Sequence, residues 1–214
     1  MSLNIQYGAG LCGPPGWKNY DSSPMLLLQR TPLLNLLPLA RNGAPYPRTV
    51  IFGDVVAGLP VADGTADLVY CSHTLEHLSL GDCRIALRKT CQMLKPGGVF
   101  RAVLPDIKVI CQEYLNAAEK SPDAAHVFMR NTHMGIETTL HGLQRLRAKF
   151  SRDSHLWMWD YSSMSAALIA AGFLSVRRAQ FGDSAHNDFG AVESRHRWEG
   201  ALGFEAQKPA IEPS

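Results

Sequence analysis

The opening stretch, residues 3–10 (Leu-Asn-Ile-Gln-Tyr-Gly-Ala-Gly), constrains the fold more than any other part of the chain. Its apolar residues alternate as in a short β-strand, and Gly8 and Gly10 then end the strand. A strand that runs into a Gly-x-Gly turn brings backbone N–H groups to the edge of a sheet. The missing Cβ atoms let a ligand come close and let φ turn positive. The turn therefore predicts a ligand site at the end of the first strand.

Length and composition favour a single domain over residues 1–214, large enough to bury a full core. The apolar share of 46% is ordinary for a globular protein, and a formal net charge of +2 is too small to indicate nucleic-acid binding. Five cysteines without a Cys-x-x-Cys pair argue against a zinc knuckle or a disulfide framework. The chain shows neither a signal-peptide pattern nor an apolar run long enough to cross a bilayer. We therefore expect a cytoplasmic protein without stable membrane insertion.

Hydrophobic periodicity predicts an alternation of strands and helices. A complete crossover helix does not fit between Gly10 and Trp17, so the first crossover helix is expected to be short or absent. Ser22 or Ser23 can cap a helix that starts at Pro24, and Ser79 with Asp82 forms a capping-box pattern. Strands are predicted at 3–7, 17–20, 48–52, 67–71, 99–104, 173–179 and 201–206, and further helices after Ser79 up to the Lys95–Gly98 turn, at 107–115, and after a serine cap up to Gly172.

The segment 25–40 holds eight leucines and is interrupted at Pro32 and Pro38. One interpretation is a helix, or two, that covers a face of the sheet, since leucine stripes usually belong to the core. The other is an exposed apolar surface for a lipid, a partner or a second copy in a homodimer.

Polar residues follow three of the predicted strands. Asp21 ends the second, Gly53 and Asp54 follow the third, and Ser72 and His73 follow the fourth. Strands that alternate with helices imply a doubly wound α/β sheet, and ligands of such sheets bind beyond the carboxyl ends of the strands. An acidic residue after the second strand can accept both hydroxyls of a ribose. The three positions together predict a nucleoside-containing ligand.

With these residues in view, the chain resembles the class I S-adenosylmethionine-dependent methyltransferases, in particular their small bacterial, methyltransferase type 11-like branch. The resemblance rests on four segments that cover about half of the chain: residues 3–10, GWKNYDSSP at 16–24, the stretch from Phe52 to Leu78 with its HTLEH sequence, and LKPGGVFRAVLPD at 94–106. It implies a Rossmann-like sheet of seven strands in the order 3-2-1-4-5-7-6, with strand seven antiparallel.

The resemblance also implies S-adenosylmethionine as the cofactor and assigns residues to it. Gly8 and Gly10 would face its methionine part, and Asp21 its ribose. The chain departs from the family where a third glycine is usual, because Gln6 stands there and Tyr7 replaces a smaller residue. A glutamine at the strand end could reach into the site or fill part of it. The full set of expected cofactor residues is Gln6, Tyr7, Gly8, Gly10, Asp21, Ser22, Gly53, Asp54, Val55, Ser72 and His73.

Methyl transfer to a hydroxyl group needs a base, and the candidates are His73, near the expected sulfonium, and His133. His73 and His77 bracket Glu76, but the sequence offers no obvious third metal ligand. We therefore expect no metal site there.

By the resemblance, residues 121–156 lie where this fold places a substrate cover. They hold His133, His141 and His155, and a basic group of Arg145, Arg147, Lys149 and Arg152. The basic group could hold an anionic acceptor, or it could be a solvated helix face. Trp157 and Trp159 could stack on a sugar ring or belong to the core.

The sequence thus predicts an S-adenosylmethionine-dependent methyltransferase that acts on a small-molecule or glycan-linked acceptor at oxygen. The alternative is a non-catalytic binding or scaffold protein with the same fold. A nicotinamide-dependent dehydrogenase is disfavoured because the full Gly-x-Gly-x-x-Gly spacing is not met and no helix follows Gly10.

Overall fold

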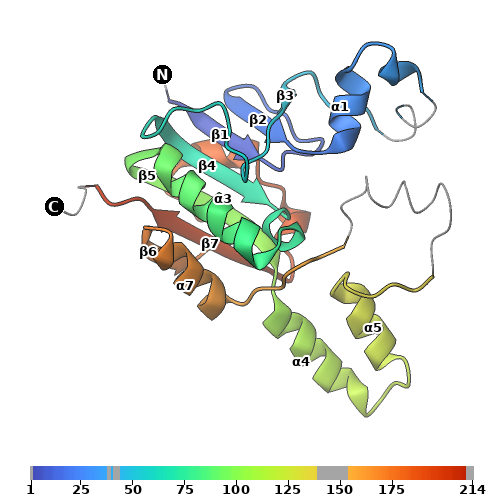
Figure 1. The fold of residues 1–214 in the computed structure, drawn as a ribbon. Coiled ribbons are helices and arrows are strands. Elements are labelled where there is room, and N and C mark those ends of the chain that lie inside the picture. Colours follow the sequence, from blue (N-terminus) through green and yellow to red (C-terminus); the bar gives the residue numbers. More distant parts are fainter. Residues whose placement is uncertain (1, 38–39, 41–43, 139–153, 211–214) are drawn as a thin grey trace.

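A seven-stranded sheet forms the centre of the protein, which we describe from a computed structural model for residues 2–37, 40, 44–138 and 154–210. Neighbouring strands follow the order β3-β2-β1-β4-β5-β7-β6, as Figure 1 shows. The first five strands of this order are parallel, and β7 is antiparallel to both of its neighbours. The expected order is therefore confirmed. The strands are β1 (Asn4–Tyr7), β2 (Trp17–Asp21), β3 (Val50–Phe52), β4 (Ala66–Ser72), β5 (Leu94–Pro105), β6 (Leu174–Arg178) and β7 (Ala201–Gln207).

A loop joins β1 to β2, and residues 8–16, which the structure describes in full, contain no helix. The side-chain amide of Asn19 stabilises this loop by donating hydrogen bonds to the carbonyl oxygens of Pro14 and Trp17, each at 3.1 Å. The Thr49 hydroxyl donates to the Gly13 carbonyl at 2.7 Å. These bonds fix the short crossover that the sequence predicts.

Helix α1 (Pro24–Arg30) follows β2, and the 3₁₀-helix η1 (Leu34–Leu36) follows α1 after Pro32. The Ser23 side chain caps α1 by accepting the Met25 N–H. Leu26 is fully buried beside β3, so the interpretation as a cover holds for this leucine. Most of the other leucines of the segment are exposed, namely Leu27, Leu33, Leu34, Leu36 and Leu37. A homodimer through the surface that these leucines form stays a prediction.

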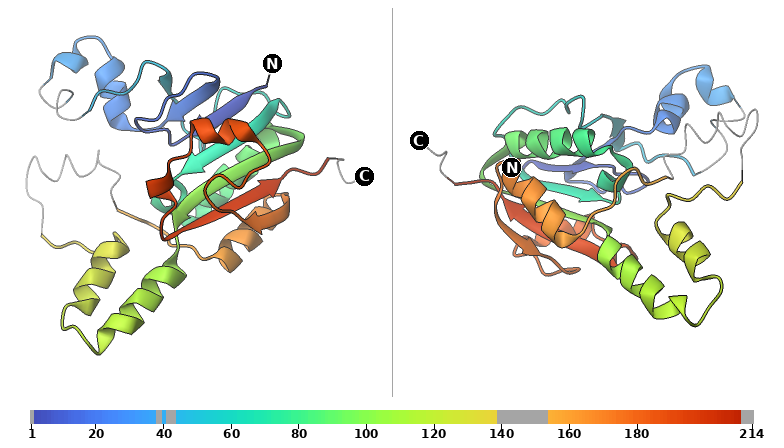
Figure 2. Two further views of the ribbon diagram at one scale, coloured as in Figure 1. Left: turned by 180° about the vertical axis from the view of Figure 1, so that it is seen from behind. Right: turned by 60° about the horizontal axis from the view of Figure 1, so that its bottom comes forward.

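Helices α3 (Leu80–Met93) and α7 (Tyr161–Ala170) lie side by side on one face of the sheet (Figures 1 and 2). They bury the main core, which includes Leu87 of α3, Leu168 of α7 and Phe100 of β5. Full burial of such a side chain stabilises the fold by about 1.5–3 kcal/mol. The Ser79 cap of α3 is confirmed. The expected serine cap of α7 is wrong, because the Asp160 carboxylate accepts the Ser163 N–H and the two residues form a capping box.

The opposite face of the sheet is covered by the connection between β6 and β7, seen from behind in Figure 2. This connection contains the 3₁₀-helices η3 (Asn187–Ala191) and η4 (Arg195–Arg197). Phe189 and Trp198 of the connection pack with Tyr70 of β4 in a second apolar cluster.

The fully buried side chain of Arg101, on β5, ties the connection to this second face. Its guanidinium donates to the carboxylates of Glu193, Asp183 and Glu205 and to the Gln180 carbonyl. It also lies 4.5 Å from the ring of Trp198. The charge of the arginine is therefore matched by three acidic residues, two of them in the connection itself.

Helices α4 (Ile107–Ala118) and α5 (Ala124–Asn131) form a hairpin that projects away from the sheet (Figure 1). The rings of Tyr114 and Phe128 pack against each other with centroids 5.3 Å apart. Ile110 and Ala124 are the residues of these two helices that are buried. The region 121–156 thus includes a helix that the sequence pattern does not predict. Its role as a substrate cover stays a prediction.

Strand β5 begins earlier than the sequence pattern predicts. Leu94 pairs with Ala66 and Val99 pairs with Leu68, so residues 95–98 form an irregular bulge inside the strand rather than a turn before it. Gly97, with φ of +77°, supplies the backbone conformation that the bulge needs. In the part of the chain that the structure describes, no helix combines the length and apolar character needed to cross a membrane.

Candidate functional site

The Asp21 carboxylate lies between the ends of β1 and β2. Its Oδ2 accepts the Gly10 N–H and its Oδ1 accepts the Ser23 N–H, each at 2.8 Å. Gly8 and Gly10 have φ of +64° and +53°, the left-handed conformation that glycine adopts without strain. Each carboxylate oxygen has two lone pairs, so both can accept a further hydrogen bond. The structure thus fixes a carboxylate in the position that the sequence predicts for a ribose acceptor.

The third strand end closes beside Asp21. The Gly53 N–H donates to the Asp21 carbonyl at 3.1 Å, and Asp54 Oδ1 accepts the Val56 N–H at 2.8 Å. Val55 is buried in the main core. Gly53, Asp54 and Val55, which are among the expected cofactor residues, are therefore adjacent to the predicted ribose acceptor Asp21.

Ser72 is the last residue of β4 and His73 follows it, and Arg197 of η4 contacts both of them. Arg197 Nε donates to Ser72 Oγ at 2.8 Å, and Arg197 Nη2 reaches the Ser72 carbonyl at 3.2 Å. His73 Nε2 donates to the Arg197 carbonyl at 2.9 Å, and His73 holds a φ of +47°. Sequence reasoning missed Arg197, which lies 125 residues after Ser72; the basic run at 195–197 is the signal that was present.

The side chains of Gln6 and Tyr7 point away from the strand end, to opposite faces of the sheet. Tyr7 is buried in the main core, where its hydroxyl accepts a hydrogen bond from the Thr90 hydroxyl at 3.2 Å. Burial raises the pKa of the Tyr7 phenol well above its ordinary value. Gln6 is also buried, beside Asn19 and Tyr70 in the register of the sheet. Any contact of either residue with a cofactor would therefore come from the backbone.

A cluster of four histidines and one glutamate, the histidine cluster, lies beyond the end of β4. It consists of His73, Glu76 and His77 around the 3₁₀-helix η2 (Leu75–His77), and of His133 and His155 from the later part of the chain. His73 Nδ1 lies 3.3 Å from Glu76 Oε1. The ring of His155 lies 4.9 Å from that of His77 and 4.8 Å from that of His133, measured between centroids.

The backbone holds the two halves of the histidine cluster together. The N–H groups of Leu156 and Trp157 both donate to the Glu76 carbonyl, at 2.8 and 3.2 Å. His155 is nine-tenths buried, and this burial lowers the pKa of its imidazole, although the nearby Glu76 carboxylate acts in the opposite direction. The structure thus brings the two predicted bases, His73 and His133, into one cluster through Glu76 and His155. The sequence analysis places His155 in the predicted substrate cover, but nothing in the sequence indicates its position beside Glu76. His141 and the basic residues Arg145, Arg147, Lys149 and Arg152 lie outside the described residues.

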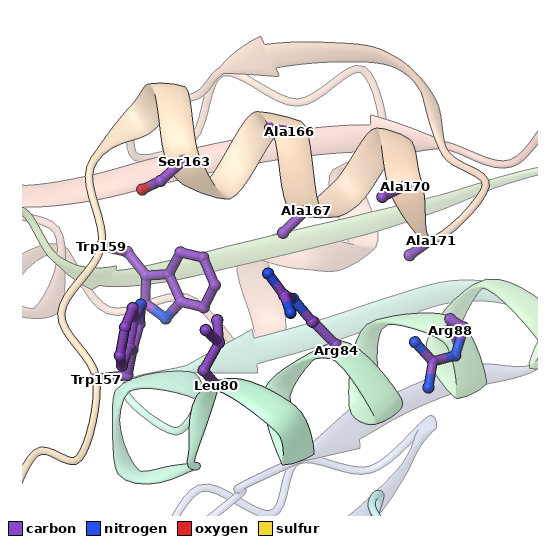
Figure 3. A pocket seen from close by; sticks show the side chains of 10 residues that line it. All are labelled: Leu80, Arg84, Arg88, Trp157, Trp159, Ser163, Ala166, Ala167, Ala170 and Ala171. Carbon is purple, nitrogen blue, oxygen red and sulfur yellow. The ribbon is translucent and has the colours of Figure 1, made fainter.

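Two pockets lie near this end of the molecule. One, of about 780 Å³, includes His133 and Ser154 with residues of α5 such as His126 and Arg130. The other, of about 520 Å³, lies between α3 and α7 and is shown in Figure 3. There Arg84 projects from α3 toward an alanine-rich wall of α7, Arg88 lies farther along α3, and Trp157 and Trp159 close one end. Trp159 belongs to the core, and Trp157 is 42% exposed.

Comparisons with known proteins agree with this fold. Residues 34–102, about a third of the chain, match the family model of the methyltransferase domain. A search of curated proteins found no match. An S-adenosylmethionine-dependent methyltransferase of Thermotoga maritima, described as a possible histamine N-methyltransferase, has a similar structure, with a TM-score of 0.50 and 16% identity over 97% of this chain and 83% of the other. A putative methyltransferase from Haloferax volcanii, solved with the Trm112 activator, gives a TM-score of 0.49 at 17% identity, with the same coverage.

The strand order, with its antiparallel β7, is that of the class I methyltransferase fold. The chain therefore has this fold, and its residues 34–102 match the methyltransferase domain model. The domain match begins after β1 and β2, so the roles of Gly8, Gly10 and Asp21 depend on the geometry described above.

Proposed function

We propose that S-adenosylmethionine binds across the carboxyl ends of β1 to β4 and that its methyl group is transferred to a hydroxyl oxygen of a small-molecule or glycan-linked acceptor. The main support for this binding site is the Asp21 carboxylate. Two backbone N–H groups donate to it, and its oxygens keep lone pairs that can accept the ribose hydroxyls. We assign Gly8 and Gly10 to the methionine part, Asp21 and Ser22 to the ribose, Gly53, Asp54 and Val55 to the adenine, and Ser72 and His73 to the surroundings of the sulfonium.

The first prediction concerns Asp21. We expect S-adenosylhomocysteine to bind to the protein, and Asp21→Asn to raise the dissociation constant about 10- to 100-fold. A hydrogen bond to a charged group contributes about 1.5–3 kcal/mol, and each 1.4 kcal/mol changes the constant tenfold. Isothermal titration calorimetry with S-adenosylhomocysteine measures this directly.

Asparagine keeps an acceptor oxygen for one of the two backbone N–H groups, so the loop is disturbed less than by alanine. Asp63→Ala is the matched control, because Asp63 is an exposed acid on the turn before β4. Equal affinity of Asp21→Asn and the wild type would contradict the assignment of the ribose site. A folded wild type that releases no heat at all would favour the scaffold function instead.

The transfer itself is an in-line displacement. When bound, S-adenosylmethionine would supply the methyl group: the acceptor oxygen would bond to the methyl carbon, and the electron pair of the broken carbon–sulfur bond would stay on sulfur, leaving S-adenosylhomocysteine. Holding the oxygen collinear with that bond supplies much of the rate acceleration. The proton of the acceptor hydroxyl passes to a base, for which we propose His133 or His73. The pocket of about 780 Å³ beside His133 supports an acceptor site there.

The second prediction concerns this base. We expect the double variant His73→Ala/His133→Ala to lower kcat by about 10²- to 10⁴-fold, the usual contribution of a positioned general base. The measurement is the initial rate of S-adenosylhomocysteine formation with a panel of hydroxylated acceptors. His186→Ala, on the β6–β7 connection, serves as the control histidine. Full activity of the double variant, with unchanged S-adenosylhomocysteine affinity, would remove the histidine base from the mechanism.

A further inference from the structure

Three side chains of the histidine cluster face one another closely enough to share a metal ion. Glu76, His77 and His155 each offer one ligand atom, and these atoms lie within 4.8 Å of one another. In a tetrahedral site with bonds of about 2.0–2.1 Å, ligand atoms are roughly 3.4 Å apart. Side-chain rotations of about 1 Å would therefore bring the three atoms to bonding distance of one ion.

The Glu76 carboxylate lacks the partners that a buried charge needs. The side chain is fully buried, and neither of its oxygens accepts a hydrogen bond from any residue that the structure describes. His73 Nδ1 is 3.3 Å from Oε1, but without hydrogen-bond geometry, and the His73 ring already donates its Nε2–H to Arg197. An uncompensated buried carboxylate costs several kcal/mol. A cation beside Glu76 would remove this cost.

The two histidines present free nitrogen atoms toward the carboxylate. His155 is 8% exposed, and its Nδ1 has no hydrogen-bond partner among the described residues. His77 Nδ1 lies 3.1 Å from the Ser154 carbonyl and donates to it, so the neutral ring keeps the lone pair on Nε2. A hydrogen bond from one ring nitrogen to a backbone carbonyl is the usual way in which a metal-binding histidine is oriented.

Backbone contacts fix this arrangement independently of the side chains. Leu156 and Trp157 donate their N–H groups to the Glu76 carbonyl, and the His155 N–H donates to the His133 carbonyl at 3.2 Å. The ligands thus come from two segments 79 positions apart that are held against each other by main-chain hydrogen bonds. The contact between these two segments supplies a third possible ligand, His155, which the sequence around His73 and His77 did not indicate.

We propose that Glu76, His77 and His155 form a site for a divalent transition-metal ion, with zinc as the first candidate. Two imidazoles and one carboxylate are a ligand set typical of zinc, and three protein ligands leave a fourth position open. The ring of His155 contacts that of His133, which borders the pocket of about 780 Å³. A catalytic role for this ion rests on the proposed function. An acceptor hydroxyl bound at the open position would lose its proton more readily, because the ion stabilises the oxygen anion.

The test is metal binding by the full chain, prepared without a histidine tag and stripped with a chelator. Calorimetric titration with Zn²⁺, and with Co²⁺ followed by its visible absorption, is expected to show one equivalent bound by the wild type. Mutation of a residue that only supports a metal ligand typically lowers metal affinity about 10- to 100-fold. Glu76→Gln and His155→Ala each remove a direct ligand, so we expect each to weaken Zn²⁺ binding by at least about 100-fold. His126→Ala is the control, because His126 is an α5 histidine that lines the neighbouring pocket of about 780 Å³ and is not one of the three ligands.

The melting temperature, measured by thermal denaturation, tests the metal site without an activity assay and also shows whether each variant is folded. The metal-free Glu76→Gln variant should be at least as stable as the metal-free wild type, because an unpaired buried charge is removed. Added Zn²⁺ should raise the Tm of the wild type and leave that of Glu76→Gln unchanged. No zinc binding by the wild type, or zinc binding by Glu76→Gln or His155→Ala with the affinity of the wild type, would overturn the site.

The same variants separate this proposal from the cofactor site. S-adenosylhomocysteine affinity should stay within about twofold of the wild type in Glu76→Gln, because the assigned cofactor residues do not include Glu76. Loss of zinc binding with intact S-adenosylhomocysteine binding would support both sites. Zinc binding without any S-adenosylhomocysteine binding would support the metal site and contradict the proposed function.

Discussion

Arg101→Met is expected to lower the free energy of unfolding by about 3–5 kcal/mol, the cost of removing one partner from a buried ion pair. Arg101 is fully buried, and its guanidinium donates to Glu193, Asp183 and Glu205. Methionine fills much of the volume but leaves the buried Glu193 carboxylate without its cation. Urea denaturation followed by tryptophan fluorescence measures the change.

Arg177→Met provides the matched control for this prediction. Arg177 pairs with two of the same acids, Asp183 and Glu205, but 40% of its side chain is exposed. Exposed ion pairs contribute about 0–1 kcal/mol, so a much smaller loss is expected. A loss below about 1 kcal/mol for Arg101→Met would show that the ion network does not hold the β6–β7 connection. The double variant Arg101→Met/Glu193→Gln should recover part of the loss, because it removes the stranded charge as well.

The sheet could be predicted from the sequence because its signals are local. Each strand has its own alternating or continuously apolar run, and the turns are marked by residues such as Gly8 and Gly53. The place of the proposed site at the carboxyl ends of β1 to β4 follows from the same signals, since parallel strands bring their ends to one edge. The Ser23 and Ser79 caps are local as well.

The contacts that complete the site depend on distant pairs, and no local pattern encodes them. Arg197 reaches Ser72 across 125 positions. His155 lies in a segment without a readable motif, and its neighbours Leu156 and Trp157 donate their N–H groups to the Glu76 carbonyl. Arg101 looks like a solitary charge in an apolar strand, because its three acidic partners lie 82 to 104 positions away. In the leucine segment 25–40 a local pattern is misleading instead. Its composition fits a core helix, but among its described leucines Leu26 alone is buried and most of the others face solvent.

Gly8→Ala is expected to disrupt the turn after β1, which we propose binds the methionine part of the cofactor, with a loss of about 2–5 kcal/mol in the free energy of unfolding and loss of S-adenosylhomocysteine binding. A Cβ atom at Gly8 would lie 1.9 Å from Thr74 Oγ1 and 2.8 Å from Thr74 Cβ and Cγ2. The left-handed φ of +64° costs an alanine about 1–2 kcal/mol, and overpacking costs a further 1–3 kcal/mol. Because Thr74 lies between His73 and η2, relief of the clash would also shift the end of β4.

Gly10→Ala separates the two costs within the same turn. Gly10 has a similar φ of +53°, but a Cβ there meets no described atom within 4 Å, so we expect the backbone cost of about 1–2 kcal/mol alone. Thermal denaturation and calorimetric titration with S-adenosylhomocysteine on both variants measure the difference. The double variant Gly8→Ala/Thr74→Gly removes the three contact atoms of Thr74 and should regain the packing part of the loss. Equal behaviour of Gly8→Ala and Gly10→Ala would mean that Thr74 yields freely, and that the close approach of Gly8 to Thr74 does not position the turn for its ligand.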